Sequence, residues 1–304
     1  MSENIVSPYS KLKKILLIIN PVSGRGNAHR HLADIVRVFS EYGCAVTVFI
    51  TKKCGDAEAY ARLYSPDFDT VVCMGGDGTL NETVFGLYKS GADIPLGYIP
   101  CGSTNDFAAC HGISSDVKTA VQNIALGSVS DLDLGCFGSR IFAYVAAFGA
   151  FSWLSYNTPQ NLKNALGHSA YYLDAIKDIP KLKAEHLKFE TERFSCEGNY
   201  IFGAICNTTS VARTIYFPEN AVDTCDGKFE VLLVHEPNSI ADFQSILYGV
   251  LNKDYSSPFL DFFHASALEI TAPDGLEWSV DGERYVGCAQ IPVRNIHKGL
   301  KLLA

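Results

Sequence analysis

The sequence predicts an open parallel α/β domain followed by a mostly antiparallel, β-rich domain. In the first half, short apolar runs alternate with helix-length segments, an order that produces βαβ crossovers and a parallel sheet. In the second half, strand-length runs follow one another, and several are joined by hairpin-type turns. The length of 304 residues suits two domains, at roughly 150 residues per domain. We expect an α/β domain over 1–132, joined by the tail 292–304, and a β-sandwich domain over 133–291.

Four apolar runs in the first half have the length and composition of buried parallel strands. The run KILLII at 14–19 is wholly apolar after its lysine, as expected for a strand that is covered on both faces. The expected strands cover 14–19, 45–50, 70–74 and 95–99. Helices are expected over 32–39, 56–64, 79–89 and from 104 onward. Each strand therefore ends in a loop that leads toward a helix.

The second half carries six strand-like runs and one strong helix signal. The runs cover 141–148, 187–194, 199–207, 229–235, 267–271 and 278–280. The helix is expected to begin at Thr158-Pro159, because threonine can cap a helix and proline suits the first helical position. It is expected to run to Ile179, before Pro180. These signals predict a sheet domain that one helix interrupts.

Composition and charge exclude several classes of protein. With 47% hydrophobic residues, the chain can bury a core and is not disordered. Its 25 Lys and Arg against 33 Asp and Glu give a net charge of −8, so we expect no nucleic-acid partner. No apolar run reaches the roughly 20 residues of a membrane helix, and the N-terminus lacks the order of a signal peptide. We expect a cytoplasmic protein.

The ten cysteines do not form a zinc-ribbon pattern. No CxxC pair occurs, so that class of metal site has no ligand set. Several cysteines, including Cys73 and Cys206, lie inside apolar runs. We expect reduced, buried thiols, as is usual in a cytosolic protein.

Three loops at the ends of the first-half strands suit a phosphate site. They cover 20–26, 75–82 and 100–107. Ligands of open α/β sheets bind at this edge, outside the carboxyl ends of the strands. Each loop can offer free backbone N–H groups to an anion, and its glycines allow a close approach. Asp77 in the second loop would repel phosphate, so it indicates an intervening Mg²⁺.

A tight strand-to-helix turn that needs glycine is the alternative for any one of these loops. The first loop is not a Walker A motif, because no Lys-Ser/Thr pair follows at the right spacing. It also lacks the third glycine of GxGxxG, where His29 stands. Three such loops at one sheet edge nevertheless favour a nucleotide-phosphate site.

Two motifs resemble the catalytic domain of the diacylglycerol-kinase family, a group that includes soluble bacterial lipid kinases. They are GGDGTLNE at 75–82 and PCGSTNDFA at 100–108, and NPVSG at 20–24 is similar to that family's first ATP loop. SYNTP at 155–159, GHSAYY at 167–172, DGKF at 226–229 and DGE at 281–283 follow in the family's order. The resemblance implies a nucleotide-binding α/β domain and a β-sandwich substrate domain, a plan similar to that of NAD kinases.

The resemblance also implies an ATP site at the sheet edge. Thr51 belongs to it, although the residues around it alone favour a loop threonine that caps the next helix. The implied ATP-binding residues are Asn20, Pro21, Val22, Ser23, Gly24, Thr51, Gly75, Gly76, Asp77, Gly78, Thr79, Leu80, Asn81, Ser103 and Thr104.

Four acidic residues are implied to be catalytic. By resemblance, Asp77 would orient Mg-ATP, and Asp133 would join the same network of water and metal. Asp281 would be the general base for the acceptor hydroxyl, with Glu283 as its partner. Without the resemblance, Asp281 belongs to an ordinary hairpin turn and Asp133 to the polar positions of a strand.

A second, structural Mg²⁺ in the β-rich domain is implied as well. Asp226 at a DG turn would bind it, with main-chain carbonyls contributed by Asp223 and Lys228. The side chain of Lys228 is excluded as a ligand because an ammonium group repels the ion. A plain turn with a solvated Asp226 is the alternative.

The implied activity is ATP- and Mg²⁺-dependent phosphorylation of the primary hydroxyl of a diacylglycerol-like lipid, a step of lipid metabolism and phospholipid biosynthesis. An NAD kinase and a sphingoid-base kinase are the enzymatic alternatives. The NxGxxGFL loop expected of an NAD kinase is replaced here by LGYIPCGS at 96–103. A catalytically weak nucleotide- or lipid-binding regulator is the alternative from another class, and the presence of Asp77, Asp281 and Glu283 argues against it.

A lipid kinase must reach a membrane, so we expect peripheral membrane contact through a local basic surface. The sequence leaves open whether the protein forms a homodimer. Basic residues gather on and after the helix expected at 158–179: Lys163, His168, Lys177, Lys181, Lys183 and Lys188. Each basic residue near an anionic surface contributes about 1 kcal/mol. A solvated helix face, diluted by Asp174 and Asp178, is the alternative.

Overall fold

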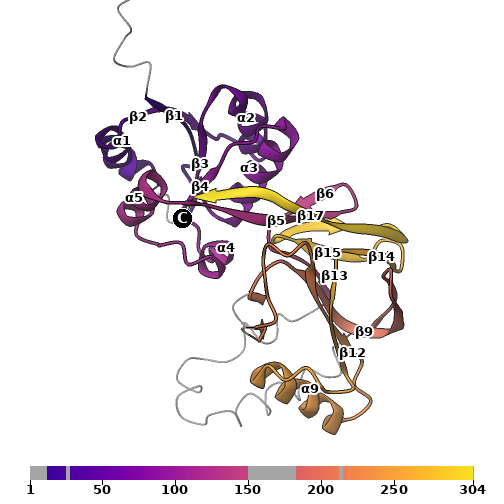
Figure 1. Cartoon of the computed structure of the whole chain (residues 1–304). Helices are drawn as coiled ribbons and strands as arrows, with labels where there is room; N and C mark the ends of the chain where they lie inside the picture. Colours follow the sequence, from indigo (N-terminus) through magenta and orange to yellow (C-terminus); the bar gives the residue numbers. More distant parts are fainter. Residues whose placement is uncertain (1–11, 25–27, 150–182, 212–214, 219, 304) are drawn as a thin grey trace, which may run out of the picture. The chain divides into compact units, whose positions relative to one another are not determined.

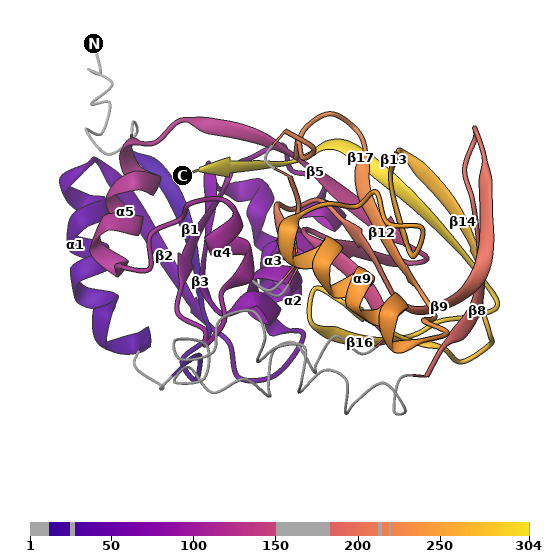
Figure 2. The ribbon, with the colours of Figure 1, turned by 90° about the horizontal axis from the view of Figure 1, so that it is seen from below.

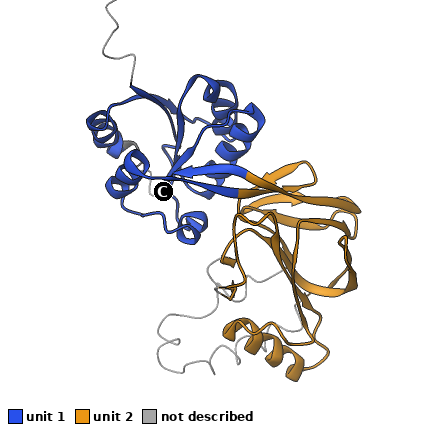
Figure 3. Ribbon diagram, viewed as in Figure 1, with its two compact units in different colours: residues 1–132, 299–304 blue, residues 133–298 orange. Residues whose placement is uncertain are grey.

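A computed structural model describes residues 12–24, 28–149, 183–211, 215–218 and 220–303 (Figure 1). The chain divides into two compact units, Met1–Leu132 with Gly299–Ala304 and Asp133–Lys298 (Figure 3). We describe each unit by itself. The helix expected at 158–179 and the motifs at 155–159 and 167–172 lie outside the described residues.

The first unit is built on a parallel sheet with the strand order β4-β3-β1-β2. Its strands are β1 (Lys13–Ile19), β2 (Cys44–Ile50), β3 (Thr70–Gly75) and β4 (Leu96–Pro100). The end of β17 (Gln290–Leu303) lies parallel to β4 through Leu302 and Leu303. From Ile15 to Ile19, β1 is at most 1% exposed, so both faces of the sheet are covered, as the apolar run predicts.

Helices lie on both faces of this sheet (Figures 1 and 2). Helices α1 (Leu32–Glu41) and α5 (Val117–Leu126) pack together beside one face, and α2 (Asp56–Tyr64) and α3 (Asp77–Ser90) pack together beside the other. The short α4 (Asp106–Cys110) and two 3-10 turns, Ala28–His31 and Ser65–Asp67, complete the unit. The predicted α/β architecture is therefore confirmed, and α5 is a helix that the sequence analysis did not single out.

The loops at the carboxyl ends of the strands start side by side. Backbone bonds continue the ladder past the strands, from Asn20 N to Met74 O (2.9 Å) and from Cys101 N to Gly75 O (2.7 Å). Thr51 N donates to Ile19 O at 2.9 Å in the same way. This edge of the sheet therefore gathers the loops that were predicted to bind phosphate.

His111 directly follows the last residue of α4, and one nitrogen of its imidazole ring is buried. Its ring centroid lies 4.4 Å from that of Phe107. The buried Nε2 has no hydrogen-bond partner among the residues that the structure describes. Burial lowers the pKa of His111 to about 4, because the imidazolium form would lose its hydration.

We expect the protein to lose stability through His111 as the pH falls from 7 to 5. The unfolded chain takes up a proton near its ordinary pKa of 6.5, whereas the folded chain resists protonation until about 4. This difference lowers the free energy of unfolding by roughly 2 kcal/mol between pH 7 and 5. His111→Phe should remove that loss, which urea unfolding of both proteins at the two pH values measures. Equal losses in both proteins would contradict the assignment.

The second unit is a mostly antiparallel, β-rich region, as predicted. Its path of strands is β16-β15-β7-β9-β8-β14-β17, with β12 paired to β9 and to β13, and β5 paired to β6. The strands are β5 (Val129–Phe137), β6 (Arg140–Phe142), β7 (Val145–Gly149), β8 (Glu185–Glu190), β9 (Ser195–Cys206), β10 (Ser210–Val211), β11 (Ile215–Tyr216), β12 (Phe229–His235), β13 (Leu260–Ala265), β14 (Ala267–Thr271), β15 (Glu277–Val280) and β16 (Glu283–Val286). Trp278 lies at the centre of the core, with ring centroids 4.7 Å from Phe137 and 4.8 Å from Phe148.

Three expectations about this unit differ from the structure. The strand expected at 141–148 breaks into β6 and β7, because the N–H groups of Ala143 and Tyr144 bind the Asp281 carboxylate. The strand expected at 187–194 ends at Glu190, where Thr191 closes a turn with Phe194. Residues 292–298 of the expected tail lie in the second unit, because this part of β17 pairs with β14.

Among the described residues of the second unit, helix α9 (Ile240–Asn252) and several strands, β13 among them, were not predicted. Helix α9 begins at Ser239, whose Oγ accepts from Asp242 N at 3.1 Å. Strand β13 follows it and pairs with β12. No helix among the described residues is both long and apolar enough to cross a membrane.

Candidate active site

The glycine-rich loops of the first unit meet backbone to backbone. A Cβ on Gly102 would lie 2.6 Å from the Cα of Gly76. Gly24 has a φ of +61°, and a Cβ there would lie 2.3 Å from the carbonyl oxygen of Cys101. Atoms cannot approach this closely without displacement, so only glycine fits at these contacts. The three predicted phosphate loops therefore lie directly against one another.

Asn20 ties the first loop to the second. Its Nδ2 donates to Thr79 Oγ1 at 2.9 Å, and its Oδ1 accepts from Val22 N at 3.1 Å. Thr79 lies in the first turn of α3, which begins after Gly76. The first N–H groups of a helix have no acceptor within it, and they suit a phosphate. The start of α3 is therefore held beside the loop that follows β1.

Asp77 is engaged by the start of the next helix. Its Oδ2 accepts from Asp106 N at 3.1 Å and its Oδ1 from Phe107 N at 3.4 Å. These are the first N–H groups of α4, whose cap Asn105 has a left-handed φ of 51°. Helix N-termini stabilise a carboxylate. The first N–H groups of α4 thus fix the orientation of the Asp77 carboxylate.

Thr51 begins a loop that Glu82 holds in place. Glu82 Oε1 accepts from Gly55 N at 2.8 Å, and Oε2 accepts from Ala57 N at 3.3 Å. Both N–H groups belong to the start of α2, so Glu82 caps that helix from α3. The sequence analysis did not single out Glu82, although it is the last residue of GGDGTLNE. Its partner helix is remote in sequence, so no local pattern could reveal this role.

The other predicted ATP residues differ in exposure. Val22, at 77% exposure, and the exposed Ser103 and Thr104 are open to a ligand. Leu80 and Asn81 are buried, at 1% and 8% exposure, and help to seat α3 in the unit. Partly exposed are Pro21, Ser23 and Gly78, while Gly75 is buried.

Asp281 of the second unit is a buried carboxylate and not a solvated hairpin residue. It is 1% exposed and has a φ of 49°. Its Oδ2 accepts from Ala143 N at 2.6 Å, and its Oδ1 accepts from Tyr144 N at 3.1 Å and Val145 N at 3.0 Å. Three backbone N–H groups hold the carboxyl group in one orientation. Glu283, two residues later, is exposed at the first position of β16.

Asp133 meets the predicted DG turn. It is fully buried on β5, and its Oδ2 accepts from Gly227 N at 2.6 Å. Its Oδ1 lies 2.8 Å from Lys298 N and 2.9 Å from His297 Nδ1. The structure thus brings Asp133 together with the turn that was predicted to bind a structural Mg²⁺.

Asn207 joins the surroundings of Asp133 to those of Asp281. Its Nδ2 donates to Asp133 O at 2.7 Å, and its backbone N donates to Tyr144 O at 2.9 Å. The N–H of Tyr144 in turn binds Asp281. Asn207 is fully buried. Sequence reasoning placed it only at the end of a strand, because nothing local marks these contacts.

The predicted Mg²⁺ turn contains an additional carboxyl group. Asp223 Oδ1 accepts from Cys225 N at 3.0 Å, and Asp226 Oδ1 accepts from Lys228 N at 2.9 Å. Glu230 is 1% exposed, and neither of its carboxylate oxygens has a partner among the described residues. Burial, together with the nearby Asp226 and Asp223, raises the pKa of Glu230 to about 8. Carboxylate oxygens are the ligands that a hard divalent cation prefers.

Comparison with known proteins identifies the family. The family model of the diacylglycerol kinase catalytic domain matches residues 14–137. A diacylglycerol kinase of Staphylococcus aureus (strain bovine RF122 / ET3-1) is 30% identical over 295 residues, covering 96% of this chain and 92% of the relative. This chain belongs to the diacylglycerol kinase family.

A second relative and a solved structure are also similar to this chain. A diacylglycerol kinase of Staphylococcus saprophyticus is 29% identical over 274 residues, which is 89% of each chain. The crystal structure of a diacylglycerol kinase from Bacillus anthracis str. Sterne has a TM-score of 0.76 at 23% identity and covers 97% of this chain and 98% of that one. It shows that the fold of this diacylglycerol kinase family member extends over both units.

Proposed function

We propose that this protein transfers the γ-phosphoryl group of ATP to the primary hydroxyl of a diacylglycerol-like lipid. Membership of the diacylglycerol kinase family makes a lipid kinase the supported class of enzyme. The observation that carries the nucleotide half of the proposal is the contact of Gly24 with Cys101 and of Gly76 with Gly102. Glycine lets the backbone of such loops approach a phosphate closely, and the first N–H groups of α3 have no acceptor within the helix.

In this proposal, the first unit binds and orients the nucleotide. The start of α3 and the loop at 20–24 would hold the phosphates, while exposed Ser103 and Thr104 add neutral hydrogen bonds. Mg²⁺ that enters with ATP would neutralise the charge of the phosphates. Charge neutralisation and positioning together supply most of the rate acceleration in phosphoryl transfer. Asp77 keeps the loops at 75–82 and 100–107 together through α4.

Asp281 is the proposed general base, and the support for it is the fixed orientation of its carboxylate. Its three backbone donors set the position of the carboxylate before substrate binds. An oriented carboxylate that accepts the hydroxyl proton contributes typically 10²–10⁴-fold to a rate. Glu283 and Asp133 are the proposed supporting groups, Asp133 acting through Asn207 and Tyr144.

One assay tests the substrate assignment. The full chain is incubated with Mg²⁺, labelled ATP and, in separate reactions, diacylglycerol, sphingosine, phosphatidylglycerol or NAD. Label in phosphatidate alone is the expected result. Label in NADP or in sphingosine phosphate would replace the proposal by the corresponding kinase, and no labelled product would support a binding regulator.

Peripheral membrane contact remains part of the proposal for the lipid substrate. Of the basic residues expected to carry it, the structure describes only Lys183 and Lys188. Both form ion pairs with neighbouring carboxylates, Lys183 with Glu185 and Lys188 with Glu190. These pairs reduce the attraction that the two lysines could offer to an anionic lipid.

We also propose that Asp223, Asp226 and Glu230 take part in a structural Mg²⁺ site. Mg²⁺ is expected to raise the melting temperature of the nucleotide-free protein, because an ion that binds only the folded chain stabilises it. Glu230→Gln should largely remove this rise, whereas Asp274→Asn, at an exposed carboxylate of the same unit, should keep it. A thermal shift with and without Mg²⁺ measures it. The same rise in Glu230→Gln as in the wild type would exclude Glu230 from the site.

A further inference from the structure

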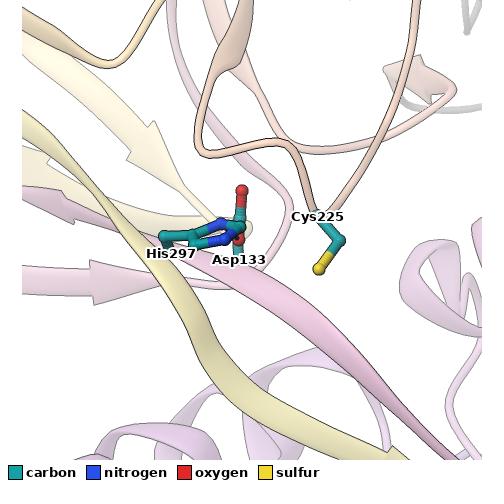
Figure 4. Close-up of side chains that lie close together, drawn as sticks. All are labelled: Asp133, Cys225 and His297. Atoms are coloured by element: carbon teal, nitrogen blue, oxygen red, sulfur yellow. Dashed lines mark hydrogen bonds and ion pairs between the residues drawn. The ribbon is translucent and has the colours of Figure 1, made fainter.

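Three potential metal ligands from distant parts of the second unit come together in the structure. Asp133 lies on β5, Cys225 in the loop before β12 and His297 on β17 (Figure 4). One ligand atom of each residue lies within 4.8 Å of the other two. The His297 side chain is 51% exposed and Asp133 is fully buried, so the cluster has one side open to solvent and one anchored in the unit.

The chemistry of this set differs from that of the neighbouring acidic turn. A thiol, an imidazole and a carboxylate are ligands that zinc accepts together, and three protein ligands leave a fourth position for water. Mg²⁺ prefers oxygen ligands alone and gains nothing from sulfur. The cluster therefore favours a soft or borderline divalent ion, in contrast to Asp223, Asp226 and Glu230.

Two of the three ligand atoms are already close to the spacing that such an ion needs. His297 Nδ1 and Asp133 Oδ1 are 2.9 Å apart, and neighbouring N and O ligands of a tetrahedral zinc ion lie roughly 3.3 Å apart. An ion between them would replace the present hydrogen bond. The N–H groups of Gly227 and Lys298 would continue to orient the Asp133 carboxylate. Such outer contacts hold metal ligands in place.

Cys225 is positioned by its own loop. Its backbone N–H donates to Asp223 Oδ1 at 3.0 Å, which fixes the turn that carries the thiol. The next two residues lead to Gly227, whose N–H binds the same carboxylate that would ligate the ion. The loop and β5 are thus already joined around the cluster.

We propose that Asp133, Cys225 and His297 bind one zinc ion. Asp133 begins the second unit, and His297 lies one residue before its end, so the ion would join the two strands by which the chain enters and leaves this unit. The Cys225 loop would be the third attachment. Because such a site forms only in the folded chain, the ion would stabilise the second unit. The inference does not depend on the kinase activity.

Cobalt(II) is the probe that tests the site directly. It is a spectroscopically visible substitute for zinc, and a bound thiolate gives it a charge-transfer band in the near ultraviolet. Titration of the full-length, reduced protein with Co²⁺ is expected to give this band at one ion per chain, and Zn²⁺ should abolish it. Excess Mg²⁺ should leave it unchanged. Cys225→Ser should remove the band, and His297→Gln should lower the Co²⁺ affinity by about 100-fold or more, since even outer contacts are worth 10–100-fold.

Matched variants separate this site from the other thiols and imidazoles of the chain. Cys288→Ser and His186→Gln replace an exposed cysteine and an exposed histidine of the same unit. Both should keep the band and the affinity. The proposal is overturned if no thiolate band appears, if Cys225→Ser keeps it, or if Cys288→Ser removes it. Asp133→Asn is left out of the test, because an amide buried among N–H donors would destabilise the unit. Circular dichroism checks that the tested variants are folded.

Discussion

Asp281→Asn is expected to lower turnover by about 100-fold or more. An amide cannot accept the proton of the acceptor hydroxyl, and base catalysis typically contributes 10²–10⁴-fold. Asparagine keeps the left-handed backbone, since it tolerates a φ near the 49° of Asp281. ATP binding should be almost unchanged, because the nucleotide loops belong to the other unit. The measurement is kcat and KM for lipid and ATP.

The same substitution is also expected to destabilise the second unit. The N–H groups of Ala143, Tyr144 and Val145 donate to both carboxylate oxygens of Asp281. The NH₂ group of an asparagine at this position would therefore face a backbone N–H. A buried donor left without an acceptor costs about 1–3 kcal/mol. Turnover must therefore be measured well below the melting temperature of the variant. Glu283→Gln, at an exposed position nearby, is the control that should keep the stability. Near-normal turnover in folded Asp281→Asn would exclude Asp281 as the base.

Gly24→Ala is expected to reduce strongly the stabilisation of the protein by Mg-ATP. The new Cβ would lie 2.3 Å from the carbonyl oxygen of Cys101, so the loops at 20–24 and 100–107 would have to separate. Separation would displace the backbone N–H groups proposed to hold the phosphates. We expect at least a tenfold loss of ATP affinity, equal to about 1.4 kcal/mol. Melting temperatures with and without Mg-ATP measure it.

Gly91→Ala is the matched control. Gly91 has a φ of +67°, close to the +61° of Gly24, but a Cβ there would meet nothing within 4 Å. Both variants bear the same backbone strain of roughly 1–2 kcal/mol, and only Gly24→Ala adds the collision. If both variants kept the ATP-dependent rise in melting temperature, the contact between the loops would be structural only.

Much of the first unit could be predicted because its signals are local. The apolar run that becomes β1 is buried on both faces. A run of this length between two loops predicts a parallel strand, and the prediction is correct here. Parallel strands place their carboxyl ends at one edge, so the meeting of the loops at 20–26, 75–82 and 100–107 follows from strand order alone. The role of Glu82 does not follow, because its partners Gly55 and Ala57 belong to another helix.

The second unit was harder to predict because its strand ends depend on remote partners. The run at 141–148 is apolar throughout, and nothing within it predicts the break between β6 and β7. The break occurs because Asp281, far along the chain, offers its carboxylate to Ala143, Tyr144 and Val145. A hairpin at 281–282 was visible in the sequence, but the burial of its aspartate was not.

The sequence by itself therefore determined the two-part fold, the glycine-rich loops at one sheet edge and the family, since each rests on short motifs or on hydrophobic periodicity. The tertiary structure alone decided which side chains meet. Asp133, Cys225 and His297 show no metal-binding spacing, and they converge only because β5, the loop before β12 and β17 are neighbours in the folded unit. Asp77 likewise changes from a bare acidic residue into the acceptor for α4 once the strands place the loops at 75–82 and 100–107 side by side. Local sequence fixes the conformation of each segment, but long-range pairing of strands sets the surroundings of each charge.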